Sequence, residues 1–148
     1  MDNNDLVYAK NGGIERLLHI MRRLRDPQTG CAWDKKQTLS SIAPYTIEEA
    51  YEVVDAIERG NMADLKGELG DLLLQTVYHA AIGEEQGLFD FHSIADGISD
   101  KMVARHPHVF TNSSQKKLKN VKQHRLQYIL KPHHKLHQTH NEHPNTLC

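Results

Sequence analysis

The segment that follows Asn61, MADLKGELGDLLLQTVYHAAIGEEQ, most constrains how this chain folds. Its apolar side chains recur at helical spacing and cover most of the circumference of the predicted helix. Such a helix is expected to be buried on nearly all sides. Polar residues interrupt the apolar surface once per turn and form one stripe, at Asp64, Glu68, Asp71, Gln75 and His79. The acidic members of this stripe therefore point toward the protein interior.

The preceding segment, TIEEAYEVVDAI, places a second acidic pair on an apolar helical face. At about 100° per residue, Glu49 shares its face with Tyr45 and Val53, and Glu52 borders that face. An ionised carboxylate in apolar surroundings costs several kcal/mol or more unless it is paired or coordinates a metal. Oxygen ligands suit Mg²⁺, and Mn²⁺ is possible. The pattern predicts a divalent cation bound by four acids, Glu49, Glu52, Glu68 and Asp71.

Charge is distributed unevenly along the 148 residues, a length that predicts one domain. Residues 1–110 carry 18 acidic and 11 basic residues, whereas residues 111–148 carry one acidic residue, seven basic residues and six histidines. The sequence contains no run long enough to span a bilayer and no apolar core of a signal peptide. Two cysteines supply no framework of disulfides. A cytoplasmic location without membrane association is expected.

Apolar periodicity and breaking residues predict four main helices in an all-α domain. Ser40 or Ser41 is expected to cap the second helix, and Asn61 is expected to cap the third. Neither strand-like alternation nor a glycine-rich phosphate loop occurs in the sequence. A lone chain has too few helices to bury the third one, so a homodimer or larger even oligomer is expected. The predicted helices span residues 13–25, 40–58, 61–86 and 90–107.

Three sequence blocks carry a resemblance to a known family. They are GCAWDKKQTLSSIAPYTIEEAYEVVDAI, DLKGELGDLLLQTVYHA and ISDKMVARHPHVF, in that order. Over residues 12–110 the chain resembles the MazG family of nucleoside triphosphate pyrophosphohydrolases. The resemblance implies an all-α, usually oligomeric fold that binds Mg²⁺ and splits a nucleoside triphosphate into monophosphate and pyrophosphate. By match to the family pattern, EExxE followed by ExxD, it implies the same four acidic ligands.

The resemblance also implies a nucleotide site. A catalytic carboxylate, Glu48 or Glu52, would orient or deprotonate the attacking water. Lys101 and Arg105 share a helix face and would clamp phosphate oxygens, although a solvated pair fits the same spacing. Trp33 would border the base, although packing in a loop fits it equally well. The implied substrate-binding residues are Tyr45, Glu49, Asp64, Lys66, Lys101, Arg105 and Trp33.

The chain departs from the family pattern after Phe110. Residues 111–148 resemble no part of the family and lack a sustained apolar face, so they are expected to be a mostly disordered basic tail, as after a frameshift or truncation. This departure leaves a second interpretation open, a nucleotide- and metal-binding module with weak or no turnover. Binding of nucleic acid or transition metals by the tail is the least favoured interpretation. Residues 1–110 are the predicted pyrophosphohydrolase domain.

Overall fold

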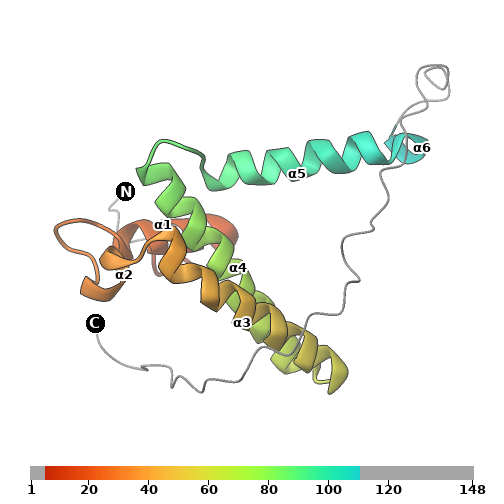
Figure 1. Ribbon diagram of the computed structural model, residues 1–148, viewed down its shortest axis with the longest axis horizontal. Helices are drawn as coiled ribbons and strands as arrows, with labels where there is room; N and C mark the ends of the chain where they lie inside the picture. The colour runs from red at the N-terminus through yellow and green to blue at the C-terminus, as the bar shows by residue number, and fades with distance from the viewer. Residues whose placement is uncertain (1–5, 111–148) are drawn as a thin grey trace. The chain divides into compact units, whose positions relative to one another are not determined.

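The computed structural model describes residues 6–110, and the regular secondary structure in this range is helical throughout. The predicted all-α fold is therefore confirmed, with four long helices and two short ones (Figure 1). The predictions for the tail, residues 111–148, lie outside the described residues. No described helix combines the length and the apolar character needed to cross a membrane. The helices are α1 (Gly13–Leu24), α2 (Ala32–Lys36), α3 (Leu39–Glu58), α4 (Met62–Glu85), α5 (Phe91–Arg105) and α6 (Pro107–Phe110).

Helix α3 begins at Leu39 because its capping residue is Thr38, two or three residues before the predicted cap at Ser40 or Ser41. The Thr38 hydroxyl accepts a hydrogen bond from the Ser41 backbone N–H at 3.1 Å, and the Ser41 hydroxyl accepts one from the Thr38 N–H at 2.8 Å. This reciprocal pair is a capping box closed by serine in place of the usual acidic or amide side chain. The segment before it contains α2, where the sequence predicted only a loop.

Helices α3 and α4 form a hairpin and make the most extensive contact between elements of the described chain (Figure 1). The chain reverses at Gly60, whose φ of 68° lies in the left-handed region that glycine adopts without strain. Asn61 then caps α4 as predicted, because its side chain accepts hydrogen bonds from the N–H groups of Ala63 at 3.2 Å and Asp64 at 3.1 Å. The two helices consequently run antiparallel.

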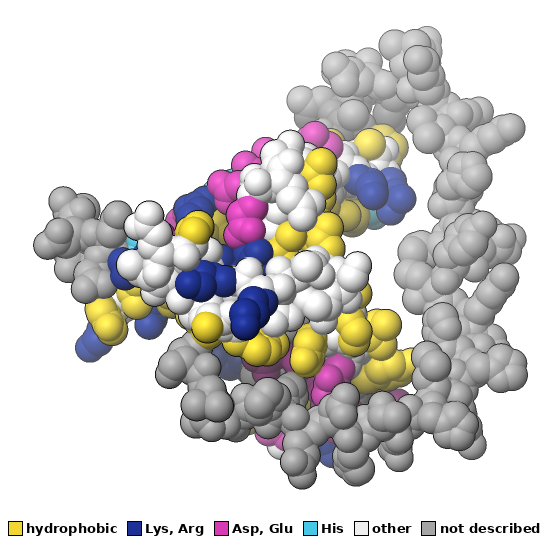
Figure 2. Space-filling model, turned by 60° about the vertical axis from the view of Figure 1, so that its left-hand side comes forward, with side chains coloured by type: hydrophobic (Ala, Val, Ile, Leu, Met, Phe, Trp, Pro, Cys, Tyr) yellow, Lys and Arg dark blue, Asp and Glu magenta, His cyan; other side chains and the backbone are white. Residues whose placement is uncertain are grey.

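The hydrophobic core lies between α1, the first turns of α3 and the second half of α4. Its buried side chains are Leu18, Met21, Ile42, Val77, Tyr78 and Ile82. The first half of α4 differs from the prediction of burial on all sides, because Leu69 and Leu73 are 49% and 41% exposed in the single chain. Figure 2 shows such hydrophobic side chains gathered on the surface of the described residues.

Arg25, at the end of α1, fixes the loop between α1 and α3 against α4. Its guanidinium donates two hydrogen bonds of 2.7 Å to the Glu85 carboxylate and one of 2.6 Å to the Asp34 carbonyl. The Tyr78 hydroxyl donates to the Asp34 carboxylate at 2.8 Å. Burial, followed by this hydrogen bond, raises the pKa of the Tyr78 phenol, so it remains a neutral donor at physiological pH. The segment that contains α2 and Trp33 is thereby held in place.

The described chain divides after Asp100, within α5, and the segment of residues 101–110 is considered by itself. It contains the last turn of α5 and the short helix α6. His106 Nδ1 lies 2.7 Å from the Met102 carbonyl. Met102, Val103, Val109 and Phe110 are exposed in this segment.

Candidate metal centre

Three of the four predicted ligands meet between α3 and α4. Glu49 of α3 and Glu68 and Asp71 of α4 each offer a carboxylate oxygen, and these oxygens lie within 4.8 Å of one another. Glu68 and Asp71 are three residues apart, so they project from one face of α4 about one turn apart. Glu49 and Glu68 are partly buried, whereas Asp71 is exposed. The antiparallel hairpin therefore brings the two acidic motifs together. The expectation that Asp71 points toward the interior is corrected, because its side chain is exposed in the described chain.

The chemistry of this donor set fits a divalent cation. Three carboxylates at such distances repel one another, and a cation between them offsets that repulsion. Each supplies only oxygen, the donor that Mg²⁺ and Mn²⁺ favour. Three protein ligands leave coordination positions for water or phosphate oxygens, and the exposure of Asp71 leaves the group open to solvent. The arrangement can thus hold a hydrated cation at the protein surface.

Glu52 does not belong to this group of three. It lies three residues after Glu49, which rotates it by about 60° around α3. Its side chain is exposed, as is that of Glu48. Both therefore remain predictions, Glu52 as a fourth ligand and either residue as the catalytic carboxylate.

A hydrogen bond joins the two helices about one turn from Glu49 on α3 and about two turns from Asp71 on α4. His79 Nε2 of α4 lies 2.9 Å from the Thr46 hydroxyl of α3. Burial lowers the pKa of His79, which favours the neutral imidazole at pH 7. The Thr46 hydroxyl also donates to the Ile42 carbonyl of the preceding turn at 3.5 Å. His79 is a hydrogen-bonded interior histidine and not one of the three clustered groups.

Asp64 forms an ion pair at the turn of the hairpin. Its carboxylate accepts a hydrogen bond of 2.8 Å from Arg59, which also donates to Asp55 at 2.7 Å. The hydrogen bonds from Arg59, to Asp64 first and then to Asp55, raise the pKa of the guanidinium. Lys66 is exposed on the same turn of α4. Neither motif predicted the clamp that Asp55, Arg59 and Asp64 form at the turn.

An aromatic pair lies at the start of α3. The ring of Trp33 meets that of Tyr45 edge to face, with centroids 6.3 Å apart and planes at 74°. Tyr45 packs against the core and lies one turn before Glu49, whereas Trp33 remains 42% exposed. An exposed indole anchored by a partly buried tyrosine provides a stacking surface. In the separate segment of residues 101–110, Lys101 and Arg105 are both exposed.

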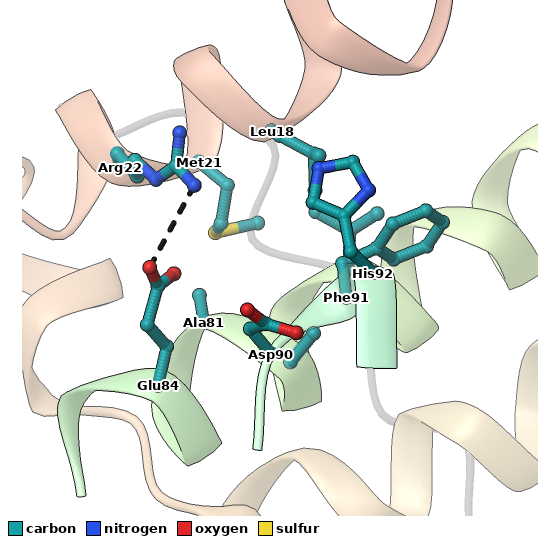
Figure 3. A pocket seen from close by; sticks show the side chains of 10 residues that line it. Leu18, Met21, Arg22, Ala81, Glu84, Asp90, Phe91 and His92 are labelled. Atoms are coloured by element: carbon teal, nitrogen blue, oxygen red, sulfur yellow. Dashed lines mark ion pairs between the residues drawn. The ribbon is translucent and has the colours of Figure 1, made fainter. Parts of the chain in front are cut away.

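A small cavity of about 20 Å³ lies elsewhere, between α1, the end of α4 and the start of α5 (Figure 3). Met21 and Leu18 border it, together with Phe91, and Arg22 approaches Glu84 across one side at 3.7 Å. A cavity of this size holds about one water molecule. None of the three clustered carboxylates lines it. It is therefore a packing space and not a nucleotide pocket.

A family model for the MazG nucleotide pyrophosphohydrolase domain matches residues 37–110. The chain belongs to the MazG family. It is 61% identical over 101 residues to a nucleoside triphosphate pyrophosphohydrolase of Escherichia coli K12, a match covering 68% of this chain and 38% of that protein. It is 48% identical over 106 residues to the nucleoside triphosphate pyrophosphohydrolase/pyrophosphatase MazG of Thermotoga maritima, covering 70% and 41%.

The fold is also similar to that of a solved structure. A mazG-related protein from Thermotoga maritima superposes with a TM-score of 0.56 at 28% identity, covering 72% of this chain and 88% of that one. This match confirms the helical fold. The chain spans about two fifths of the length of the two curated relatives.

Proposed function

We propose that this MazG domain, residues 1–110, hydrolyses nucleoside triphosphates to nucleoside monophosphate and pyrophosphate with Mg²⁺ or Mn²⁺. The observation that carries the proposal is the group of three carboxylates that two helices bring together. Glu49, Glu68 and Asp71 would hold the cation, with Glu52 as a fourth ligand at the edge of the group. When bound, the cation neutralises triphosphate oxygens and polarises the phosphoryl group.

The remaining site residues act on water and nucleotide. Glu48 or Glu52 takes a proton from the water that attacks the α phosphorus. The bond from that phosphorus to the bridging oxygen breaks, and pyrophosphate leaves. The base rests against Trp33 and Tyr45, whose contact provides a stacking surface one turn from Glu49. Asp64 and Lys66 complete the nucleotide contacts from α4. In the separate segment of residues 101–110, Lys101 and Arg105 are proposed, from the sequence alone, to bind phosphate oxygens.

The product of the reaction tests this proposal. The protein is incubated with a panel of canonical and damaged nucleoside triphosphates in Mg²⁺, and pyrophosphate is measured separately from orthophosphate. Release of pyrophosphate with an equal amount of monophosphate is expected. Release of orthophosphate alone contradicts the proposed reaction.

A nucleotide-binding module with weak or no turnover is the second candidate function. The observation that favours it is the departure from the family pattern after Phe110, because residues 111–148 resemble no part of the family and the family model matches residues 37–110. Saturable binding of a nucleoside triphosphate in Mg²⁺, without product, distinguishes this candidate from the enzyme.

We further propose that the domain functions as a homodimer or a larger even oligomer. A row of apolar side chains on α3, Ile47, Tyr51 and Val54, is about half exposed or more. These residues lie at i, i+4 and i+7, so they form one stripe. Leu69 and Leu73 extend the exposed apolar surface on α4. Exposed apolar surface of this kind on one chain favours the packing of a second copy of the chain against it.

A further inference from the structure

Gln75 is the one polar side chain that is buried within residues 6–110, with 8% of its surface exposed. Its Oε1 atom is enclosed and has no hydrogen-bond partner among the described residues. Buried polar atoms in native proteins are hydrogen-bonded in the large majority of cases, and an exception calls for an explanation, of which a bound water or ion is one. The position of Gln75 indicates where such a partner lies.

The register of the α3–α4 hairpin predicts that Gln75 lies near the level of Glu49. The hydrogen bond between Thr46 and His79 fixes one level of the antiparallel pair. One turn closer to the hairpin turn, α3 reaches Glu49 while α4 reaches Gln75. Gln75 follows Asp71 by four residues, and side chains on a helix lean toward its N-terminus. Helix geometry therefore predicts that the amide reaches from the buried end of the hairpin toward Asp71.

We propose that Gln75 is a positioning residue of the carboxylate site. Its Oε1 accepts a hydrogen bond from a water molecule in the hydration shell of the cation that Glu49, Glu68 and Asp71 hold. This inference rests on the proposed metal site. Mg²⁺ keeps several of its waters, and their hydrogens need acceptors. A neutral amide oxygen supplies one acceptor without adding a fourth charge to three clustered acids.

Outer-shell partners of this kind commonly change metal affinity by 10–100-fold when they are removed. The side chain of methionine has nearly the shape of glutamine but lacks the amide oxygen. Gln75→Met is therefore expected to weaken the apparent affinity by about tenfold or more. The melting temperature of the metal-free protein is expected to stay equal or rise, because the substitution removes an unsatisfied buried atom. A purely structural glutamine would change the melting temperature and leave the affinity unaltered.

The affinity is measured on the full chain by titration with Mn²⁺, followed by electron paramagnetic resonance, with Mg²⁺ as competitor. The matched control is Thr76→Val, an adjacent substitution of similar shape whose hydroxyl lies 3.5 Å from the Leu72 carbonyl. It is expected to bind Mn²⁺ like the wild type. Unchanged affinity in Gln75→Met overturns the proposal. If that variant does not fold, Gln75→Glu decides, because it keeps an acceptor oxygen and should keep or raise the affinity; a loss in it overturns the proposal.

Asp71→Asn in the same titration separates this inference from the proposed metal site. The histidines of residues 111–148 are present in every variant, so any Mn²⁺ that they bind contributes equally. If Asp71→Asn binds Mn²⁺ as tightly as the wild type, the carboxylate site is wrong and the role of Gln75 is overturned with it. If Asp71→Asn loses binding while Gln75→Met does not, only the role of Gln75 is overturned.

Discussion

The two halves of the α3–α4 hairpin have similar apolar content but very different burial. In the half distant from the turn, Val77 and Ile82 are 1% and 2% exposed, because α1 and the start of α3 cover them. In the half near the turn, Tyr51 and Leu69 are 58% and 49% exposed. The clustered carboxylates lie between these regions. The same helical pattern therefore builds a core in one half and an accessible surface in the other.

The comparison shows what each half contributes. The buried half provides a rigid support, in which Tyr78 and Arg25 also fix the preceding loop. The outer half leaves Asp71 exposed while Glu49 is held partly buried at the boundary. A site at such a boundary combines fixed ligands with access for a charged substrate. Variants in the two halves should consequently separate activity from stability.

The largest expected effect is the loss of activity on removing an acid from the boundary. Asp71→Ala should lower pyrophosphate release by more than about a hundredfold, since even outer-shell partners contribute 10–100-fold. Its metal-free stability should remain equal or rise, because repulsion between carboxylates decreases. Rates and urea unfolding are measured together. Glu58→Ala, an exposed acid at the end of α3, is the control and should change neither. Near wild-type release from Asp71→Ala would refute the assignment.

The buried half should show the opposite behaviour, a loss of stability. Met21→Ala removes a side chain that is 1% exposed and packs in the core, so it should lower the free energy of unfolding by about 2–5 kcal/mol. Leu73→Ala, in the outer half, should cost much less when unfolding is measured at low protein concentration. A cost for Leu73→Ala that grows with protein concentration would identify a second copy on this surface. If Leu73→Ala lowered the free energy of unfolding as much as Met21→Ala at every protein concentration, the contrast between the halves would be wrong.

The sequence predicted which faces of the helices point inward better than it predicted where the helices begin or which elements pack against them. The inward direction of Glu49 and the cap at Asn61 follow from local spacing, and the structure contains both. The start of α3 was misplaced because a threonine with a serine three residues later closes a capping box without an acidic residue. The short helix α2 was missed because five residues carry too little periodicity.

Contacts between distant residues account for the rest of what the sequence could not predict. The bonds from Arg25 to Glu85 and from Tyr78 to Asp34 join residues 60 and 44 positions apart. No local pattern indicates such partners. Gln75 was visible as a member of the polar stripe, but its burial became evident only with the packing of α3 on α4. Exposure of the outer half was likewise hidden, because periodicity identifies an apolar face without showing what covers it.

Glycines within α4 test the same contrast with smaller changes. A Cβ at Gly83 would overlap the ring of Phe89, so Gly83→Ala should destabilise the protein by about 1–3 kcal/mol. At Gly70 nothing within 4 Å would meet a Cβ in the described chain, so Gly70→Ala should stabilise the helix by up to about 1 kcal/mol. Both are measured by urea unfolding. Destabilisation by Gly70→Ala would show that another surface packs closely at this position. It would contradict the inference that the outer half is accessible.

The smallest expected effect is a pH dependence from His79 at the buried end of the site. Burial holds its folded-state pKa below the ordinary value of 6.5, so the unfolded chain binds its proton more readily. Its contribution to stability is therefore present above about pH 6.5 and is lost as the pH falls through the lowered folded pKa. His79→Gln keeps a polar partner for Thr46 but does not titrate. Melting temperatures of both proteins are compared from pH 8 to pH 5, so that carboxylate titration common to both cancels. The wild type should lose stability relative to His79→Gln below about pH 6.5, and parallel curves would show that the imidazole is not held neutral by burial.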